Sequence, residues 1–181
     1  MDTLPDYLRR GLTVVSIGLN PSIPSVRHGF YFANPRNRFW RALNESELVG
    51  EHLHAGLSAQ EWLFAKCGIG FTDVVKRPTP GAAALRAADF RADSPILRDK
   101  ILRYAPEIAW FHGKVAYRHY ARYTGNKLAQ VEWGLQPLLI GQSKIFVTPN
   151  PSPANAAFSL SILVDWYNEL HKLVQSVSRS G

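Results

Sequence analysis

Short apolar runs that alternate with helical patterns are the feature that most constrains how this chain folds. The run Thr13-Val14-Val15-Ser16-Ile17 is almost continuously apolar, which is typical of a strand buried on both faces. Four such strands are predicted, over Thr13–Leu19, Phe71–Val75, Glu107–Phe111 and Lys144–Thr148. Because helices are predicted between them, the strands are expected to join through parallel crossovers in a three-layer α/β domain.

Capping residues and helical spacing place the helices. They are expected over Asn37–Asn44, Ser58–Cys67, Ser94–Tyr104, Gly113–Tyr123 and Ser159–Val174. Ser58 and Glu61 form a capping-box pattern, and Ser94 with Pro95 is typical of an N-cap and a first helical residue. The last helix carries apolar residues at helical spacing, which predicts a core-facing stripe.

Length and composition suit a single domain, residues 1–181, because 46% of the chain is hydrophobic. Cys67 is the sole cysteine, which excludes an internal disulfide and a cysteine-ligated iron–sulfur cluster. No apolar run approaches the roughly 20 residues of a membrane helix, and the N-terminus lacks signal-peptide features. We expect a monomer without membrane contact, located in the cytoplasm or, in a eukaryote, in the nucleus.

The net charge of +7 and the pI of about 9.8 favour a polyanionic partner. Arginines and aromatic residues alternate near the first strand: Arg27, Phe30, Tyr31, Phe32, Arg36, Arg38, Phe39, Trp40 and Arg41. Lys76 and Arg77 follow the second strand. Cations interleaved with rings suit phosphate contact and base stacking. The alternative is a solvated basic face over core aromatics.

Two Asn-Pro loops follow predicted strands. Gly18-Leu19-Asn20-Pro21-Ser22 comes after the first strand, and Thr148-Pro149-Asn150-Pro151-Ser152-Pro153 comes after the fourth. Open α/β sheets bind ligands at the carboxyl ends of their strands, so Asn20 and Asn150 are expected at one edge of the sheet. An amide can hold a water or a carbonyl without carrying charge, which suits a leaving group that departs as an anion. Each Asn-Pro pair by itself is also compatible with an ordinary turn.

Several common catalytic signatures are absent from the sequence. No Gly-x-Gly-x-x-Gly follows the first strand, and there is no P-loop and no Gly-x-Ser-x-Gly nucleophile elbow. His52 and His54 lack the further ligands of a metal site, so no metal is expected. The zinc-dependent base deaminases need more cysteines than this chain has.

Five further segments, taken in order, carry the most specific signal. They are Gly29–Trp40 (GFYFANPRNRFW), Gly70–Thr79 (GFTDVVKRPT), Gly113-Lys114, Trp133–Gln136 (WGLQ) and Pro149–Ser152 (PNPS). With Gly-Leu-Asn-Pro they resemble the mismatch-specific uracil/thymine DNA glycosylases of the uracil-DNA glycosylase superfamily. The order and the spacing are those of the family, from about residue 13 to the C-terminus.

The resemblance implies a short, mainly parallel sheet between helical layers, with a cleft at the strand ends. It also implies a substrate of double-stranded DNA with damaged or mismatched bases, and no cofactor. Asn20 would position the attacking water, and Phe32, if it is not simply a core residue, would be the floor on which an extruded pyrimidine stacks. Ser25 and Asn150 would lie near the base. The expected DNA-binding residues are Arg36, Arg38, Lys76, Arg77, Ser152, Pro153, Ala154 and Asn155.

Two residues depart from the family pattern. Asp73 stands where relatives carry lysine or asparagine, and it activates water as a general base, caps a turn, or pairs with Lys76 or Arg77. Ala154 stands where relatives insert a wedge into the duplex. Alanine is a poor plug, which leaves mismatch discrimination open. His112 either lines the cleft or packs structurally.

The sequence therefore predicts a monofunctional DNA glycosylase of base excision repair. It would hydrolyse the N-glycosidic bond of uracil, with thymine and modified pyrimidines as further candidates, preferentially opposite guanine. No lysine is placed for a Schiff base, so strand cleavage is not expected. Two alternatives remain: a catalytically weak or inactive nucleic-acid-binding module on the same fold, and a hydrolase or transferase of free nucleotides. The absence of a phosphate-binding motif counts against the second.

Overall fold

A computed structural model describes residues 2–180, and within this range five strands form one sheet in the order β2-β1-β3-β5-β4. The strands are β1 (Val14–Gly18), β2 (Ile69–Asp73), β3 (Ile108–His112), β4 (Gly134–Ile140) and β5 (Ser143–Thr148). β2, β1, β3 and β5 are parallel, whereas β4 pairs with β5 in the antiparallel direction at one edge. The expected short, mainly parallel sheet is confirmed.

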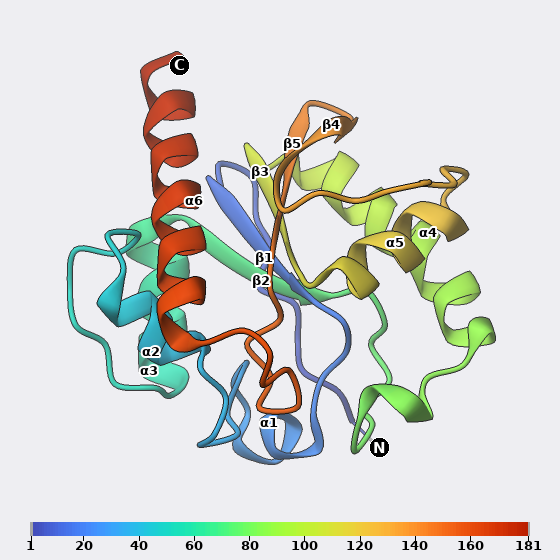
Figure 1. Cartoon of the computed structure of the whole chain (residues 1–181), viewed down its shortest axis with the longest axis horizontal. Helices are drawn as coiled ribbons and strands as arrows, with labels where there is room; N and C mark the ends of the chain where they lie inside the picture. The colour runs from blue at the N-terminus through green and yellow to red at the C-terminus, as the bar shows by residue number, and fades with distance from the viewer. Residues whose placement is uncertain (1, 181) are drawn as a thin grey trace.

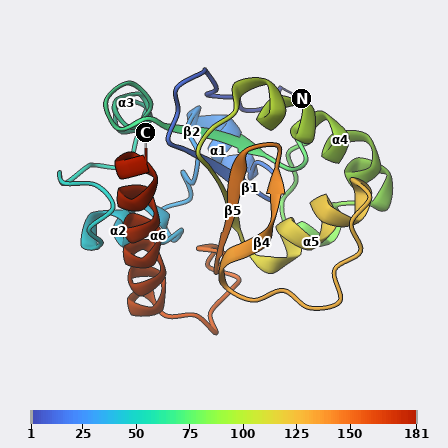
Figure 2. The same ribbon diagram turned by 90° about the horizontal axis from the view of Figure 1, so that it is seen from above.

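Helices cover both faces of this sheet. They are α1 (Ile23–His28), α2 (Phe39–Glu45), α3 (Leu57–Trp62) with the π-helical turn η1 (Leu63–Cys67), the 3-10 turn η2 (Ala82–Ala84), α4 (Ala87–Tyr104), α5 (Lys114–Tyr123) and α6 (Leu160–Ser180). α2, α3 and α6 lie on one side of the sheet, and α4 and α5 lie on the other (Figure 1). Figure 2 shows the same three layers from above. The three-layer α/β fold is thus confirmed.

Alternation along the strands divides their side chains between two cores. The core under α2 and α6 takes Val14, Ile69, Phe71, Ile108, Trp110 and Phe146, and the core under α4 and α5 takes Val15, Ile17, Ala109, Phe111, Ile145 and Val147. By the same alternation, the last residues of the four parallel strands belong to the row on the α2 and α6 side. These residues are Asp73, Gly18, His112 and Thr148, paired in register as Gly18 with Asp73 and His112 with Thr148. One polar row therefore crosses the carboxyl edge of the sheet.

The structure adds α1, which was not predicted, and extends α6 to Ser180; it differs further from the prediction at β4 and at the start of α4. Strand β4 was not predicted, because Gly134 and Pro137 interrupt it and its side chains alternate between buried and exposed. Proline is tolerated here because β4 is an edge strand, where a missing N–H breaks no inner ladder.

The start of α4 was also wrong. It begins at Ala87 rather than at Ser94, and Pro95 lies inside the helix. Asp89 caps the first turn by accepting a hydrogen bond of 2.8 Å from the Arg86 backbone N–H. A helix of 18 residues with a buried apolar face tolerates the one backbone hydrogen bond that Pro95 removes.

Strand β2 lies two residues earlier than expected, and its continuation tightens the edge of the sheet. Val74 and Val75 donate backbone hydrogen bonds of 2.9 and 3.0 Å to the carbonyls of Gly18 and Leu19. The chain after β2 thus runs alongside the chain after β1.

None of the helices within residues 2–180 combines the length and the apolar character of a membrane-spanning segment.

Candidate active site

Gly18 opens a space at the centre of the polar row. A Cβ at this position would lie 2.6 Å from Asp73 Oδ1, which is closer than real Cβ contacts come. The carboxylate of Asp73 therefore leans over Gly18 from the neighbouring strand. Any larger residue at position 18 would push Asp73 away, so this glycine keeps the carboxylate at the strand end.

Asn20 is locked in one orientation just beyond Gly18. Its Nδ2 donates to the Arg77 carbonyl at 2.9 Å and to Thr79 Oγ1 at 2.8 Å. A carbonyl can only accept, and the Thr79 hydroxyl already donates to the Gly81 carbonyl at 2.8 Å, so the amide nitrogen must face both groups. Asn20 Oδ1 is left as an acceptor without a partner among residues 2–180. The Asn20 residue is half-buried, so this oxygen is an acceptor at the carboxyl edge of the sheet.

Phe32 adopts a strained left-handed backbone conformation with φ of 58°. The amides on either side of it are held, because Tyr31 N donates to Gln60 Oε1 at 2.7 Å and Ala33 N donates to Ser25 Oγ at 3.1 Å. The Phe32 N–H has no such partner within the described chain. Ser25 thus lies near the predicted base floor and supports its backbone.

The ring of Phe32 stacks on Phe39, with centroids 4.2 Å apart and planes at 22°. It also meets the edge of the His112 ring at 5.1 Å. Phe32 is half-buried and Phe39 is fully buried, so the core holds Phe32 from below. This contact puts the predicted floor beside the polar row of the sheet.

His112 forms a neutral wall of the site. Its Nε2 is 2.8 Å from Ser16 Oγ, and burial lowers the pKa of His112 to about 3. In the part of the chain that the structure describes, Nδ1 is buried without a hydrogen-bond partner. The imidazole therefore carries no charge at neutral pH, and it has one nitrogen left to bond.

Asp73 is the buried carboxyl group of the row. Burial raises the pKa of Asp73 to about 6, opposed by the nearby Lys76 ammonium. Asp73 Oδ2 lies 3.5 Å from Lys76 Nζ but makes no hydrogen bond within residues 2–180. Of the interpretations left open, pairing with Lys76 is observed, and the role of general base stays a prediction. The raised pKa puts the group near the range in which a general base works.

Asn150 approaches the row from the other side. Its Oδ1 accepts a hydrogen bond of 2.9 Å from Ser152 N, so its two Nδ2–H donors point elsewhere and have no partner in the described range. Gly113 has φ of 100°, and a Cβ on it would lie 3.3 Å from Asn150 Cβ. This close approach brings the Asn150 loop against the end of β3. The site thus offers an acceptor on Asn20 and donors on Asn150.

The four cations predicted to bind DNA have different surroundings. The Arg38 guanidinium donates to carbonyls of Ser152 at 3.2 Å and Asn155 at 3.1 Å, and also to the Phe158 carbonyl. Arg77 pairs with Asp89 at 2.7 Å, and Lys76 turns inward. Arg36 is exposed, with no ion pair among the residues described. Of the four, Arg36 is the cation most available to a phosphate.

The remaining predicted contact residues lie on the loop after β5. Ser152, Pro153 and Asn155 are half-buried, and Ala154 is exposed. Ser152 Oγ accepts from Ala154 N at 3.3 Å, and Asn155 Nδ2 donates to the Asn150 carbonyl at 3.0 Å. Figure 1 shows this loop, between β5 and α6, at the edge where the parallel strands end. His52 and His54 are exposed, and no group of three or more possible metal-binding side chains is found within residues 2–180.

Sequence reasoning assigned no supporting role to the residues that hold the site, although Gly18 and Thr79 lie in motifs that it singled out. Gly18, Thr79 and Gln60 hold Asp73, Asn20 and Phe32 in place through contacts between distant parts of the chain. For Thr79, its place in the segment Gly70–Thr79 was an available signal. For Gln60 no sequence pattern indicated a backbone partner 29 residues away.

Comparison with known proteins identifies the class to which this fold and site belong. Residues 5–171 match the model of the uracil DNA glycosylase superfamily, and the chain belongs to that superfamily. The solution NMR structure of a candidate uracil DNA glycosylase from Methanosarcina acetivorans is similar, with a TM-score of 0.62 and 23% identity. The match covers 96% of this chain and 98% of that chain. Superfamily membership implies a DNA substrate and a function in DNA repair.

Proposed function

We propose that this chain is, over its whole length, a monofunctional DNA glycosylase that removes uracil from duplex DNA, most readily opposite guanine. The observation that carries the proposal is the locked amide of Asn20. Both of its donors are used by Arg77 and Thr79, which leaves Oδ1 as an acceptor at the strand edge. An acceptor held in this way can align a water for attack on the sugar C1′.

Base binding follows from the groups around that acceptor. A base inside a duplex is out of reach, so the nucleotide must rotate into the site. The half-buried Phe32 ring offers a stacking surface, and its free backbone N–H offers a donor. The Nδ2 donors of Asn150 complement the carbonyl oxygens of a pyrimidine. Donors aimed at a base that gains negative charge stabilise its departure.

Asp73 supplies the charge that the neutral amide lacks. As the C1′–N1 bond breaks, positive charge develops on the sugar and negative charge on the base. An ionised Asp73 would stabilise the cationic sugar or take a proton from the attacking water. Lys76 donates to Tyr31 and pairs with two carboxylates, so it does not serve as the nucleophile of a Schiff base. The product is then an intact strand with an abasic site.

Release of uracil from labelled duplexes tests the proposal. Duplexes with uracil opposite guanine, uracil opposite adenine and thymine opposite guanine are incubated with excess enzyme, then treated with alkali. We expect cleavage after alkali only, fastest for uracil opposite guanine. Strand cleavage without alkali would contradict monofunctional chemistry.

One observation favours the second candidate, a weak or inactive DNA-binding module. Ala154 is exposed at the loop that would fill the duplex after base extrusion, and its side chain is a single methyl group. If the chain binds duplex DNA but releases no base from any of these substrates, this second function holds and the first is rejected.

A further inference from the structure

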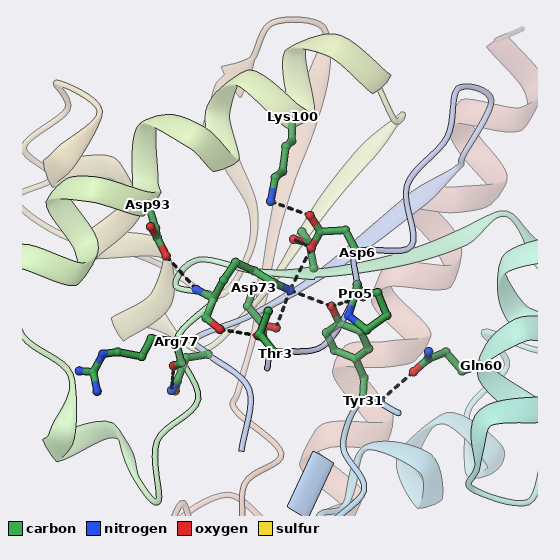
Figure 3. Close-up of polar contacts among 12 residues, drawn as sticks. Thr3, Pro5, Asp6, Tyr31, Gln60, Asp73, Arg77, Asp93 and Lys100 are labelled. Carbon is green, nitrogen blue, oxygen red and sulfur yellow. Dashed lines mark hydrogen bonds and ion pairs between the residues drawn. The ribbon is translucent and has the colours of Figure 1, made fainter. Parts of the chain in front are cut away.

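A partly buried cluster of charges adjoins Asp73, and its centre is Lys76. The Nζ atom of Lys76 is 2.9 Å from Asp6 Oδ1 and 3.5 Å from Asp73 Oδ2, and it donates to the Tyr31 hydroxyl at 3.1 Å. Figure 3 shows Asp6 between Lys100 and the contacts around Asp73 and Tyr31. One ammonium group is thus shared by two carboxylates, and it lies closer to Asp6 than to Asp73.

Asp6 is held firmly in this position although it comes from the N-terminal segment. Its Oδ1 accepts from Thr72 Oγ1 at 2.7 Å, and its Oδ2 pairs with Lys100 of α4 at 2.6 Å. The segment is fastened to β2 by two backbone hydrogen bonds between Tyr7 and Phe71, of 2.8 and 3.0 Å. Asp6 cannot drift away from Lys76 without breaking these contacts.

The two carboxylates differ in their access to water. The Asp6 side chain is 22% exposed, and it borders an open cavity of about 310 Å³ that Lys100, Arg103 and Asp99 also line. The Asp73 side chain is 4% exposed. The cluster is therefore accessible to solvent at Asp6 and shielded from it at Asp73, in the candidate active site, and Lys76 lies between the two carboxylates.

We propose that Asp6 is a positioning residue of this site. By holding the Lys76 ammonium close to its own carboxylate, Asp6 weakens the electrostatic attraction between Lys76 and Asp73, and it thereby sets the pH range of base excision. This inference rests on the proposed function, because it assigns Asp73 a part in catalysis. Asp6 contacts neither the base nor the sugar. Its effect passes through Lys76.

The surrounding charges determine the direction in which Asp6 shifts the pKa of Asp73. Burial raises the pKa of Asp73, Lys76 and Lys100 lower it, and Asp6 raises it. Although burial acts in the opposite direction on Asp6, Lys76 and Lys100 hold the pKa of Asp6 below its usual value. Asp6 is thus the charged partner and Asp73 the carboxyl group that titrates near neutral pH.

The other neighbours of the cluster bring no further charge to the ammonium of Lys76. Tyr31 faces the cluster from the loop after α1, and burial raises its pKa, so the hydroxyl stays neutral. Asp93 of α4 accepts from the backbone N of Lys76 at 2.9 Å rather than from its ammonium. Arg77 turns outward to Asp89.

Two substitutions of opposite sign test the inference. Asp6→Asn releases Lys76 toward Asp73, so the acidic limb of the single-turnover pH–rate profile should move to lower pH by about one unit. Lys76→Met removes the cation, so the limb should move to higher pH by about as much. Lys76→Arg, which keeps the charge, should restore the wild-type position. The matched control is Asp99→Asn, which removes a carboxylate at the same cavity outside the cluster and should leave the limb in place.

A second readout does not depend on activity. Titration of the Asp73 carboxyl carbon by ¹³C NMR in the full chain should shift in the same directions in the two variants. Thermal unfolding identifies any variant that fails to fold, and Lys100→Met replaces Lys76→Met in that case, because Lys100 is the second cation that lowers the pKa of Asp73. We expect Lys100→Met to shift the Asp73 titration to higher pH.

The outcomes separate the inference from the function on which it rests. Normal uracil release with an unchanged acidic limb in Asp6→Asn and Lys76→Met overturns the inference and leaves the proposed function intact. If the wild-type chain releases no uracil, the proposed function fails. In that case an unchanged NMR titration of Asp73 in the variants overturns the link between Asp6 and Asp73, and a shifted one supports it.

Discussion

The two loops that carry the asparagines are held in different ways. The loop after β1 is bonded to the chain after β2 by backbone and side-chain hydrogen bonds, and Asn20 and the buried Asp73 both belong to this wall. The loop after β5 is half exposed, and a single side chain, Arg38, reaches three of its carbonyls. The first wall is joined by several backbone and side-chain hydrogen bonds. The second wall, which is the loop after β5, depends mainly on its own turns and on Arg38, through the guanidinium and through a backbone hydrogen bond of 3.1 Å to the Pro151 carbonyl.

This difference suits the two regions to different steps of the proposed reaction. Bond breaking needs groups held to a fraction of an ångström, which suits the wall between β1 and β2. A duplex that must be opened presents a variable surface, which suits the looser loop after β5. Substitutions on the first wall should then change the chemical step, whereas those on the second should change engagement of the duplex.

The largest effect is expected at Asn20. Asn20→Ala removes the acceptor that we propose for the attacking water, and such a loss typically costs on the order of 100-fold or more in single-turnover rate. Affinity for the duplex should stay nearly unchanged, because this amide is not placed for phosphate contact. Asn126→Ala, an exposed amide remote from the site, is the control. Equal rates for Asn20→Ala and the wild type would remove Asn20 from the mechanism.

Asp73→Asn should lower excision by about 100-fold and abolish the acidic limb near pH 6. The neutral amide can neither take a proton nor stabilise a cationic sugar. Single-turnover rates from pH 5 to 8 measure both effects. A normal rate over this range would assign Asp73 to structure alone.

The same substitution should stabilise the fold at neutral pH. The pKa of Asp73 is raised from 3.8 to about 6, so the folded state holds a proton that the unfolded state releases, and stability falls as pH rises between these values. At pH 7 that difference corresponds to about 3 kcal/mol, which Asp73→Asn should recover. Urea unfolding at pH 4 and pH 7 measures it. If the variant gains no more stability at pH 7 than at pH 4, the raised pKa is wrong.

On the second wall, Arg38→Met should lower excision from duplex DNA by roughly tenfold, because it removes the guanidinium contacts that hold the loop after β5. A tenfold change corresponds to about 1.4 kcal/mol. The dependence of binding on salt should change little, because the guanidinium is already occupied by the carbonyls of the loop after β5. Binding at several salt concentrations tests this. A clear drop in the salt slope would show that Arg38 reaches a phosphate.

Arg36→Met is the matched variant and should have the smallest effect. Its guanidinium is exposed, so loss of one phosphate contact should reduce the salt slope by about 0.9. Excision by saturating enzyme should remain close to normal. An unchanged slope would leave Arg36 without a part in DNA binding.

Much of the fold could be predicted because its signals are local. Apolar runs, caps and helical spacing placed the four parallel strands and most helices, and the strand-end rule put Asn20 and Asn150 at one edge. Strand β4 escaped because an edge strand needs neither continuous apolar residues nor freedom from proline. The start of α4 escaped because the tertiary core, rather than Pro95, decides where that helix begins.

By itself, the sequence determined the alternation that makes the sheet, the glycine at the end of β1 and the two Asn-Pro loops that follow parallel strands. Only the tertiary structure decided what each side chain does there. The partners of Asn20 lie 57 and 59 residues away along the chain, and Asp6 reaches Lys76 from the N-terminal segment. Local pattern fixes backbone conformation, whereas charge, burial and hydrogen-bond orientation depend on neighbours that no sequence spacing reveals. For this reason the positions of the candidate site residues follow from the sequence, and the raised pKa of Asp73 follows from the fold.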